Sequence, residues 1–350
     1  ARMTELGVDV LCCSVGPELP YLVGYQAMPL ERLTMLVVPR DAAAVLVVPR
    51  LEAPRVEDDP DAFTLEAWEE TDDPIARVAT HVGAARVVAI GDQTWARFVL
   101  ALQQALPGAR FCSANDVVGP LRVLKDPDEV ERLGRAANAV DEIAVRLRES
   151  RLVGRTEHDV AREIAGQILD AGHERVNFVI VASGPNGASP HHDPGPRVIK
   201  AGDVVLCDFG GTMQGYCSDI TRMYVAGDPT TEVREAYDAL TIAQETAVRA
   251  AIVGTPCEAV DAAARHVLVA AGLGERFVHR TGHGIGMDAH EDPYVVQGNA
   301  TPLAPGHAFS IEPGVYVPGR FGLRLEDIVV ATPDGPLRLN DAPRDLAVVA

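Results

Sequence analysis

The sequence predicts an α/β protein of two domains, an N-terminal α/β domain followed by a larger α+β domain that contains an internal repeat. Three observations support this fold class. The chain has 350 residues, which suits two domains of roughly 150 residues each. Its first third alternates short β-branched runs with helical patterns. The remainder contains two similar series of motifs about one hundred residues apart.

Four runs rich in β-branched residues predict strands in the first third of the chain. They cover residues 8–15, 34–38, 44–48 and 86–90. Asp73 followed by Pro74 predicts the start of a helix that ends near Val82, and residues 92–106 predict another. This segment is a self-contained unit of about 120 residues, a usual domain size.

A long helix is expected at the start of the second domain. Asp126 and Pro127 place an acid and an N1-type proline at its beginning, and arginines lie near its expected end at Arg151. Charges of these signs stabilise the two ends of a helix. We therefore place the first domain at residues 1–122 and the second at residues 123–350.

The second domain repeats one pattern of elements. Capping-box sequences at residues 156–159 and 255–258 open two helices, which end before the C′-type glycines Gly172 and Gly272. An apolar strand, a loop rich in glycine and histidine, and a strand pair led by glycine follow each helix. We expect the two halves to share one architecture.

Each half of the repeat supplies two carboxylates, six and four residues after successive glycines. They are Asp208 and Asp219 in the first half, and Glu312 and Glu326 in the second. We expect Asp208 and Glu312 each to end an otherwise apolar strand. Because a buried carboxylate without a partner is unfavourable, four converging carboxylates require cations nearby. Two divalent ions would balance their charge.

His283 is the expected nitrogen ligand, because Gly282 and Gly284 on either side let the backbone approach closely. One imidazole with four oxygen donors favours harder ions over Zn²⁺, which prefers tetrahedral sites rich in nitrogen and sulfur. We expect two divalent metal ions, Mn²⁺ first, with Co²⁺ or Zn²⁺ as alternatives.

Composition and charge exclude several classes of protein. The 31 Lys and Arg against 50 Asp and Glu give a formal charge of −19, and such a field repels nucleic acid and anionic membranes. No membrane span or signal peptide is predicted, so the expected location is the cytoplasm. The six cysteines contain no C-x-x-C pair and are expected as buried thiols. Asp208-Phe-Gly210 matches a kinase triplet, but no other kinase motif accompanies it.

The motifs of the chain together resemble those of one enzyme family. They are Ser183-Gly-Pro-Asn-Gly-Ala-Ser-Pro-His191, Asp208-Phe-Gly, Gly215-Tyr-Cys-Ser-Asp-Ile-Thr-Arg222, Gly282-His-Gly-Ile-Gly, His290-Glu-Asp-Pro293, Ile311-Glu-Pro-Gly-Val-Tyr316 and Arg324-Leu-Glu-Asp327. The sequence resembles the creatinase/prolidase-type "pita-bread" metallopeptidases, closely over residues 125–340 and more loosely over residues 1–120. The resemblance implies a creatinase-like α/β domain followed by a pita-bread catalytic domain with pseudo-two-fold symmetry.

By this resemblance, the metal ligands are Asp208, Asp219, His283, Glu312 and Glu326. Asp219 and Glu326 would bridge the two ions, whereas Asp208 and His283 would each bind one of them. Glu312 would bind on the other side and also shuttle a proton during the reaction. A hydroxide held between the ions would attack the scissile carbonyl.

Further residues are expected around the ligands. His191 and His290 match histidines that contact the substrate and stabilise the tetrahedral intermediate in the family. Arg324 is expected to orient Glu326 by a charge-assisted hydrogen bond. Tyr216 is either a packing residue or a hydrogen-bond donor near the ligands. Outside these roles, several histidines are expected in structural or surface positions: His158, His173, His192, His266 and His279.

The resemblance implies a peptidase that cleaves the Xaa-Pro bond of small peptides. Methionine aminopeptidases usually lack a preceding domain, so the first third of the chain favours the proline-directed members. The expected activity is Xaa-Pro dipeptidase (prolidase), and the expected partners are a small peptide substrate and a second copy of the chain in a homodimer. An aminopeptidase P acting on longer peptides and a non-catalytic binding module are the alternatives.

Dipeptide selectivity depends on how the terminal carboxylate of the substrate is held. Some dipeptidases of the family carry an arginine shortly after the His-Glu-x-Pro motif for this purpose, where this chain has Tyr294. Arg197 and Arg320 are the candidate replacements.

Overall fold

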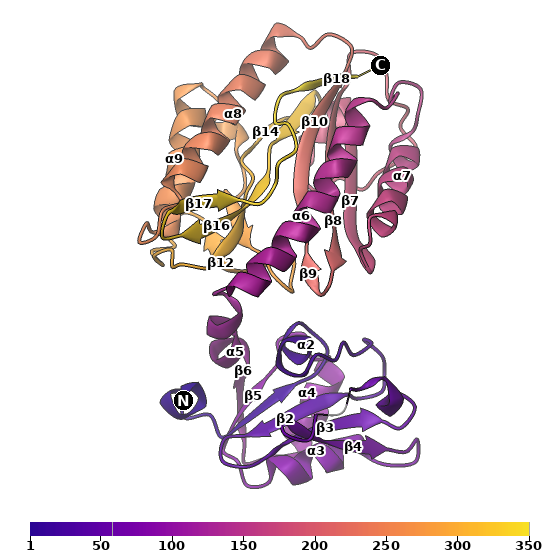
Figure 1. Cartoon of the computed structure of the whole chain (residues 1–350), viewed down its shortest axis with the longest axis vertical. Helices are drawn as coiled ribbons and strands as arrows, with labels where there is room; N and C mark the ends of the chain where they lie inside the picture. The colour runs from indigo at the N-terminus through magenta and orange to yellow at the C-terminus, as the bar shows by residue number, and fades with distance from the viewer. Residues whose placement is uncertain (58, 350) are drawn as a thin grey trace. The chain divides into compact units, whose positions relative to one another are not determined.

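A computed structural model describes residues 1–57 and 59–349. The chain divides into two compact units, Ala1–Arg122 and Val123–Ala350 (Figure 1). Each has its own hydrophobic core. No helix within the described residues is both long enough and apolar enough to cross a bilayer.

The first unit is built on a six-stranded sheet in the order β4-β3-β2-β1-β5-β6. The strands are β1 (Val10–Cys13), β2 (Met35–Pro39), β3 (Ala44–Pro49), β4 (Phe63–Trp68), β5 (Val87–Ile90) and β6 (Arg110–Ser113). β1, β5 and β6 are parallel, whereas β1, β2 and β3 run antiparallel. The four predicted strands are confirmed, and β4 and β6 were not predicted.

Helices cover both faces of this sheet, as the α/β class requires. They are α1 (Arg2–Leu6), α2 (Glu18–Val23), α3 (Pro74–Val82), α4 (Ala96–Ala105) and α5 (Asn115–Arg122), with a 3₁₀ turn η1 (Ala53–Arg55). Cys12 packs with α3 and α4, whereas the next residue, Cys13, packs with α2 and α5 on the opposite face. This alternation follows from the two-residue period of a strand.

The predicted helices of the first unit are confirmed in kind but not in every boundary. The Asp73 carboxylate accepts hydrogen bonds from the backbone N–H groups of Ile75 and Ala76, which caps α3 as expected. The second predicted helix begins only at Ala96, four residues after its predicted start. Helix α1, which precedes the first strand, was not predicted.

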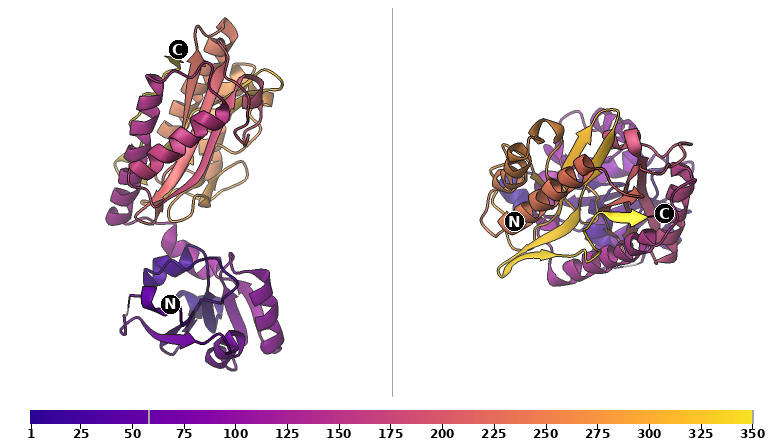
Figure 2. Two further views of the ribbon diagram at one scale, coloured as in Figure 1. Left: turned by 90° about the vertical axis from the view of Figure 1, so that its right-hand side faces the viewer. Right: turned by 90° about the horizontal axis from the view of Figure 1, so that it is seen from above.

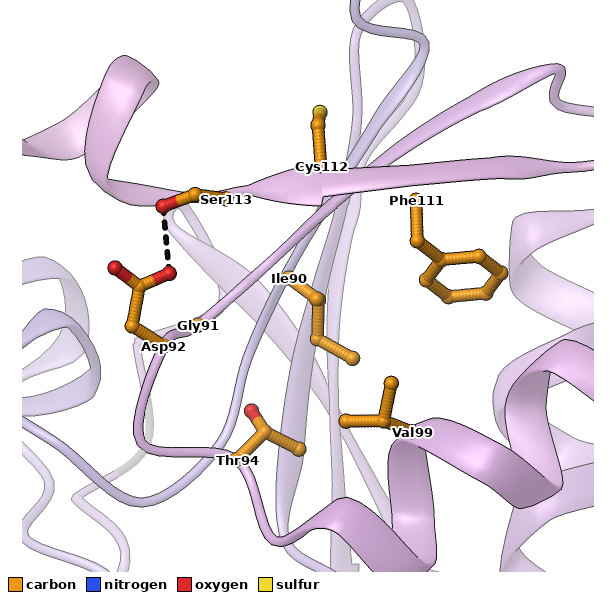
Figure 3. Close-up of a pocket in the computed structure, with 8 residues that line it drawn as sticks. All are labelled: Ile90, Gly91, Asp92, Thr94, Val99, Phe111, Cys112 and Ser113. Carbon is orange, nitrogen blue, oxygen red and sulfur yellow. Dashed lines mark hydrogen bonds between the residues drawn. The ribbon is translucent and has the colours of Figure 1, made fainter.

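A pocket of about 320 Å³ lies in the first unit, where β5 and β6 end and α4 begins (Figure 3). The Ser113 hydroxyl donates a hydrogen bond of 2.5 Å to Asp92 at its edge. Ile90, Val99 and Phe111 supply apolar lining. One carboxylate is present in this lining, so the pocket lacks the ligand set that the sequence predicts for a metal site.

The second unit contains two five-stranded sheets and a two-stranded ribbon. The first sheet, in the order β18-β10-β8-β7 with β9 paired to β8, comprises β7 (Arg175–Ser183), β8 (Val204–Met213), β9 (Tyr216–Cys217), β10 (Ile220–Ala226) and β18 (Ala347–Val349). The second, in the order β12-β11-β13-β16-β17, comprises β11 (Gly282–Gly284), β12 (Glu291–Val295), β13 (Ala308–Ile311), β16 (Asp327–Thr332) and β17 (Gly335–Arg338). The ribbon pairs β14 (Gly314–Val317) with β15 (Phe321–Arg324).

Four helices pack against these strands. They are α6 (Pro127–Arg148), α7 (Glu157–Asp170), α8 (Thr231–Ala250) and α9 (Cys257–Ala270), with 3₁₀ turns η2 (Gly184–Ala188) and η3 (Gly274–Arg276). α6 and α7 share a core with β7, β8 and β10, and Figure 2 shows them lying over these strands. α8 and α9 share a core with β13 and β16. The long helix that begins at Asp126 is confirmed, with both hydrogen bonds of a capping box.

The repeat is confirmed at its two helices and two strand pairs, with two corrections in the second half. The apolar strand expected after the second helix was wrong, because the segment between α9 and β11 contains the 3₁₀ turn η3 instead. α7 and α9 each end before a glycine with a left-handed backbone, Gly172 at φ 95° and Gly272 at φ 75°. Thr156 forms the predicted capping box. The predicted capping box at Thr255 was wrong, because α9 begins one residue later, after Pro256, which has no side-chain hydrogen bond to give.

The six cysteines are free thiols, as predicted. Five are buried, and Cys112 is partly exposed. Burial raises the pKa of the Cys12 thiol to about 12 and that of Cys217 to about 11. These thiols therefore stay protonated at neutral pH and behave as small apolar side chains.

Candidate metal centre

The strand pairs of the two halves bring the four predicted carboxylates to the inside of the second unit. Asp219 lies just before β10, Glu312 directly follows β13, and Glu326 directly precedes β16. The prediction that Asp208 ends a strand was wrong, because β8 continues five residues beyond it to Met213. There β8 pairs with β9.

Asp219, His283 and Glu326 form the tightest part of the cluster. One ligand atom from each lies within 4.8 Å of the other two, and all three side chains are buried. His283 Nε2 also lies 3.1 Å from Glu312 Oε1 and 3.9 Å from Asp219 Oδ2. The structure thus brings residues from four separate segments to one point.

His283 presents its Nε2 atom to the carboxylates because its backbone and Nδ1 are both held. Its backbone N–H donates to Ser310 Oγ at 3.0 Å, and its Nδ1 lies 3.1 Å from the Gly284 carbonyl. A Cβ atom at Gly282 would lie 1.8 Å from the Ser310 carbonyl oxygen, and one at Gly284 would lie 2.2 Å from that of Asp292. The expected close approach at these two glycines is confirmed.

The cluster carries buried acceptor atoms that no protein donor satisfies. Asp208 Oδ1 and Glu326 Oε1 are both buried and lack a hydrogen-bond partner among the described residues. Burial raises the pKa of the Asp219 carboxyl well above its usual range, and the neighbouring Glu326 and Asp208 charges add to this. Burial likewise raises the pKa of Glu326. Unsatisfied oxygens and mutually repelling carboxyls fit a site for divalent cations.

Arg324 binds Asp208 and not the carboxylate that the sequence suggested. Its guanidinium donates to Asp208 Oδ2 and, through Nε, to Thr221 Oγ1 at 3.2 Å. Thr221 in turn donates to Glu326 Oε2 at 2.7 Å. The expected direct bond from Arg324 to Glu326 was therefore wrong, since Thr221 lies between them.

Two further residues, His279 and Tyr316, extend this network. Arg324 Nη1 donates to the Tyr316 hydroxyl at 2.8 Å, and that hydroxyl lies 2.9 Å from His279 Nε2. His279 Nδ1 lies 2.7 Å from the Arg280 carbonyl oxygen, so the ring donates there and accepts from Tyr316. Burial raises the pKa of Tyr316 to about 12 and lowers that of His279.

Sequence reasoning missed Thr221, Tyr316 and the role of His279. Thr221 and Tyr316 both lie within motifs already noted, two residues after Asp219 and four after Glu312. Their closeness in sequence to these expected ligands was the signal that could have identified them. His279 lies outside every motif, and its contacts depend on a strand pair that follows it by more than thirty residues.

The two histidines expected at the substrate lie differently. The His290 ring centroid is 3.8 Å from that of His283, so the structure brings it to the cluster. His191 is exposed and makes no hydrogen bond to a described residue. The carbonyl of the preceding Pro190 accepts from Arg324 at 3.1 Å.

His192 and Tyr216 contact residues other than the predicted ligands. His192 Nε2 lies 2.9 Å from Glu157 Oε2, in agreement with its predicted structural role. The Tyr216 hydroxyl donates to Glu129 on α6 at 2.8 Å, and its ring packs with Leu133 and Ile285. Of the two roles left open for Tyr216, these contacts favour packing.

Glu157 stabilises the loop that carries His191 by accepting hydrogen bonds from it. This fully buried carboxylate accepts hydrogen bonds from Ser183, both backbone and hydroxyl, and from Asn186 and Gly195. Burial alone would raise its pKa, but these bonds and that from His192 leave it below the usual value. The loop thereby gains a fixed conformation.

The two candidate arginines for a substrate carboxylate are both engaged elsewhere. Arg197 binds Asp203 through both terminal nitrogens and also donates to Ser183. Arg320 binds Glu232 in the same two-pronged manner. A two-pronged pair with a carboxylate occupies the donors that a second carboxylate would need.

Comparison with known families and structures agrees with this arrangement. Residues 131–333 match metallopeptidase family M24, and residues 1–124 match the creatinase/prolidase N-terminal domain. The probable dipeptidase PepE of Mycobacterium tuberculosis is 45% identical over 100% of this chain and 94% of its own length. The Xaa-Pro dipeptidase of Lactobacillus helveticus is 35% identical over 97% of this chain and 95% of its own. A prolidase structure from Thermococcus sibiricus has a TM-score of 0.94 at 36% identity, covering 99% of this chain and 96% of that one.

Proposed function

The chain belongs to metallopeptidase family M24, and from this premise we propose that it is a dipeptidase that hydrolyses the Xaa-Pro bond of small peptides. The observation that carries the proposal is the buried cluster of Asp219, His283 and Glu326, whose ligand atoms lie within 4.8 Å of one another. The relatives named as dipeptidases match the chain over nearly its whole length. On this proposal, residues 1–122 are the creatinase-type domain and residues 123–350 the catalytic domain.

The donor set supports two divalent ions as the resident cofactor. Asp208, Asp219, Glu312 and Glu326 supply carboxylate oxygens, and His283 supplies one nitrogen. Oxygen-rich sets favour Mn²⁺, with Co²⁺ or Zn²⁺ as alternatives. As the family resemblance implies, Asp219 and Glu326 would each help to hold both ions, whereas Asp208, His283 and Glu312 would complete the donor set. When bound, such ions supply Lewis acidity toward the scissile carbonyl and acidify the attacking water.

Around the ligands, the protein residues would position groups and move protons. Arg324 holds one oxygen of Asp208 and leaves Oδ1 for a cation. Glu312 lies within reach of the centre through Oε1, 3.1 Å from His283 Nε2, and would pass the proton of the attacking water to the leaving nitrogen. His290, next to His283, and His191 would stabilise the negative charge of the tetrahedral intermediate.

Hydrolysis of Leu-Pro by purified protein loaded with Mn²⁺ tests the proposed activity. Release of free proline is expected, together with its loss on chelation and its recovery when Mn²⁺ is added back. Leu-Ala serves as the control for proline selectivity. No turnover of any Xaa-Pro peptide by protein shown to hold two ions would contradict the proposal.

The same assay separates the dipeptidase from the alternative aminopeptidase P. We expect Leu-Pro to be a better substrate than Leu-Pro-Pro, whereas an aminopeptidase P would prefer the longer peptide. The proposal also includes a homodimer, as the family resemblance implies, and a cytoplasmic location. Light scattering of the purified protein tests the oligomeric state.

A further inference from the structure

Arg280 is a partly buried arginine with no carboxylate partner among residues 1–57 and 59–349. Its guanidinium makes no hydrogen bond or ion pair within the part of the chain that the structure describes. Several arginines of the surrounding segments do have carboxylate partners: Arg197, Arg265, Arg320 and Arg324. An arginine kept partly out of water without a partner is unusual, since burying a charge is costly. This suggests that its partner comes from outside the chain.

The guanidinium of Arg280 is held in a defined position. Its central carbon lies 4.4 Å from the ring centroid of Tyr294. Tyr294 belongs to β12, and its backbone carbonyl accepts from the Asn299 side chain at 2.6 Å. The carbonyl of Arg280 itself accepts from His279 Nδ1 at 2.7 Å. A stacked guanidinium loses less freedom when it binds a ligand, and its outer nitrogens stay available to an anion.

This position lies beside the cluster of predicted metal ligands. Arg280 comes three residues before His283, and the next residue, Thr281, donates its N–H to Val295 at 3.0 Å. β12, which carries Tyr294, begins directly after His290. The His290 ring centroid lies 3.8 Å from that of His283. The two segments that hold Arg280 in place therefore lead directly into His283 and His290 of the cluster.

We propose that Arg280 binds the terminal carboxylate of the peptide substrate and so makes the enzyme selective for dipeptides. The inference rests on the proposed function and adds a specificity-determining residue to it. In a dipeptide, the carboxylate lies one residue beyond the scissile bond, so its cation must lie beside the reacting centre. A longer peptide has an uncharged amide at that place and gains nothing from an arginine there. Guanidinium and carboxylate match in shape and charge.

Steady-state kinetics with two matched substrates tests this role. Leu-Pro carries the carboxylate, whereas Leu-prolinamide has a neutral amide in its place. We expect Arg280→Met to raise the KM for Leu-Pro by roughly tenfold or more, as the loss of one charged partner implies. The kcat should change little, and the kinetics with Leu-prolinamide should stay as in the wild type. Arg280→Lys keeps the positive charge but not the paired hydrogen-bond donors of a guanidinium. Its KM for Leu-Pro should therefore lie between those of the wild type and Arg280→Met.

Arg249→Met is the matched control, because Arg249 is an exposed arginine with its own carboxylate partner, Glu245. It should leave both substrates unaffected. Each variant is first checked for metal content and thermal stability. If Arg280→Met does not fold, the Arg280→Lys comparison and the wild-type preference for Leu-Pro over Leu-prolinamide provide the test.

The outcomes distinguish the inference from the proposed function. If wild-type protein with two ions hydrolyses no Xaa-Pro peptide, the proposed function fails. If the wild type hydrolyses Leu-Pro but does not prefer it to Leu-prolinamide, only the inference is overturned. The same holds if Arg280→Met changes neither substrate, or changes both equally, because Arg280 would then act through packing against Tyr294.

Discussion

At the scale of single residues, Asp219 shows the free-energy cost of burying several carboxylates close together. Burial, together with the charges of Glu326 and Asp208, raises the pKa of its carboxyl. In the metal-free protein this carboxyl is therefore destabilising in its ionised form. With cations present, the same charge holds them in place. One residue thus opposes folding without metal and supports it with metal.

Replacement of Asp219 by Asn should separate these two effects. We expect the variant to lose at least one of two ions and to lose activity by roughly two orders of magnitude or more. Its metal-free form should be at least as stable as the metal-free wild type, because a buried charge is gone. Elemental analysis, peptide hydrolysis and thermal unfolding of metal-free protein measure the three effects.

Asp228→Asn is the control for this experiment, because Asp228 is exposed after the end of β10. It should change none of the three measurements. Full metal content and activity in Asp219→Asn would contradict the assignment of Asp219 as a ligand.

His307 is a buried residue whose titration should make stability depend on pH. Its Nδ1 accepts the backbone N–H of Ala304 at 3.2 Å, which requires the neutral ring. Burial, aided by the Lys125 charge, lowers its pKa from 6.5 to about 4. The unfolded chain therefore binds more protons than the folded one between these values, so the free energy of unfolding decreases as the pH falls from 6.5 to 4. The loss is at most about 3 kcal/mol.

His307→Gln should make this dependence weaker, because an amide can accept the same hydrogen bond but does not titrate in this range. Urea unfolding of metal-free protein at pH 7 and pH 4.5 measures the difference. His266→Gln, on the exposed face of α9, should keep the wild-type dependence. An equal pH dependence in all three proteins would rule out His307 as its source.

At the scale of elements, α7 and α9 occupy corresponding places in the repeat but begin differently. Thr156 Oγ1 accepts from the backbone of Asp159 at 3.1 Å and donates to its carboxylate at 2.7 Å. Thr255 lies outside α9, which begins after Pro256. The corresponding threonines of the two halves, Thr156 and Thr255, therefore have different structural roles.

Alanine at the two threonines should reveal this difference in stability. We expect Thr156→Ala to lower the free energy of unfolding by about 1 kcal/mol, the usual contribution of an N-cap. Thr255→Ala should cost no more than a few tenths of a kcal/mol. Urea unfolding with a common m value measures both. Equal losses at both positions would show that Thr255 caps α9 in solution.

Strand β8 shows why a sequence pattern can misplace the end of an element. Gly210 and Gly211 follow Asp208 and suggest that the strand stops there. In the fold, these glycines continue the strand and let β9 and the following turn approach. A Cβ atom at Gly210 would lie 2.0 Å from the Ser218 carbonyl oxygen. From the sequence alone, a glycine that ends a strand cannot be distinguished from one that lets a neighbouring segment approach closely.

At the scale of the whole molecule, metal binding should contribute to the stability of the fold. The charge of −19 includes the four carboxylates of the cluster, which two divalent ions would neutralise. A ligand that binds only the folded state stabilises it by about 2.7 kcal/mol at one hundred times its dissociation constant. Removal of metal by a chelator should therefore lower the unfolding temperature, and Mn²⁺ should restore it.

Scanning calorimetry of metal-loaded and metal-free protein measures this shift. Asp219→Asn should show a smaller shift on addition of Mn²⁺, because its centre is incomplete. An unfolding temperature that does not change after complete removal of metal would mean that the ions do not bind the folded state preferentially.

The sequence by itself predicted many of the elements and pointed to the residues expected to carry the chemistry. Strand and helix periods are local, so β1, α3 and α6 could be predicted. The repeat spacing pointed to Asp208, Asp219, Glu312 and Glu326 as equivalent positions. The family resemblance added the role expected of each ligand, and the Asp219→Asn experiment tests the role of Asp219.

Only the tertiary structure decided how these residues contact one another. Arg324 lies two residues from Glu326 in sequence but binds Asp208, 116 residues away. Thr221 joins Glu326 across 105 residues, and Arg280 stacks on Tyr294 of the neighbouring strand. The first two contacts depend on how the two halves of the repeat pack against each other, and the third depends on the pairing of neighbouring segments within the second half. Sequence spacing gives distance along the chain, whereas a charge or a hydrogen bond acts over distance in space.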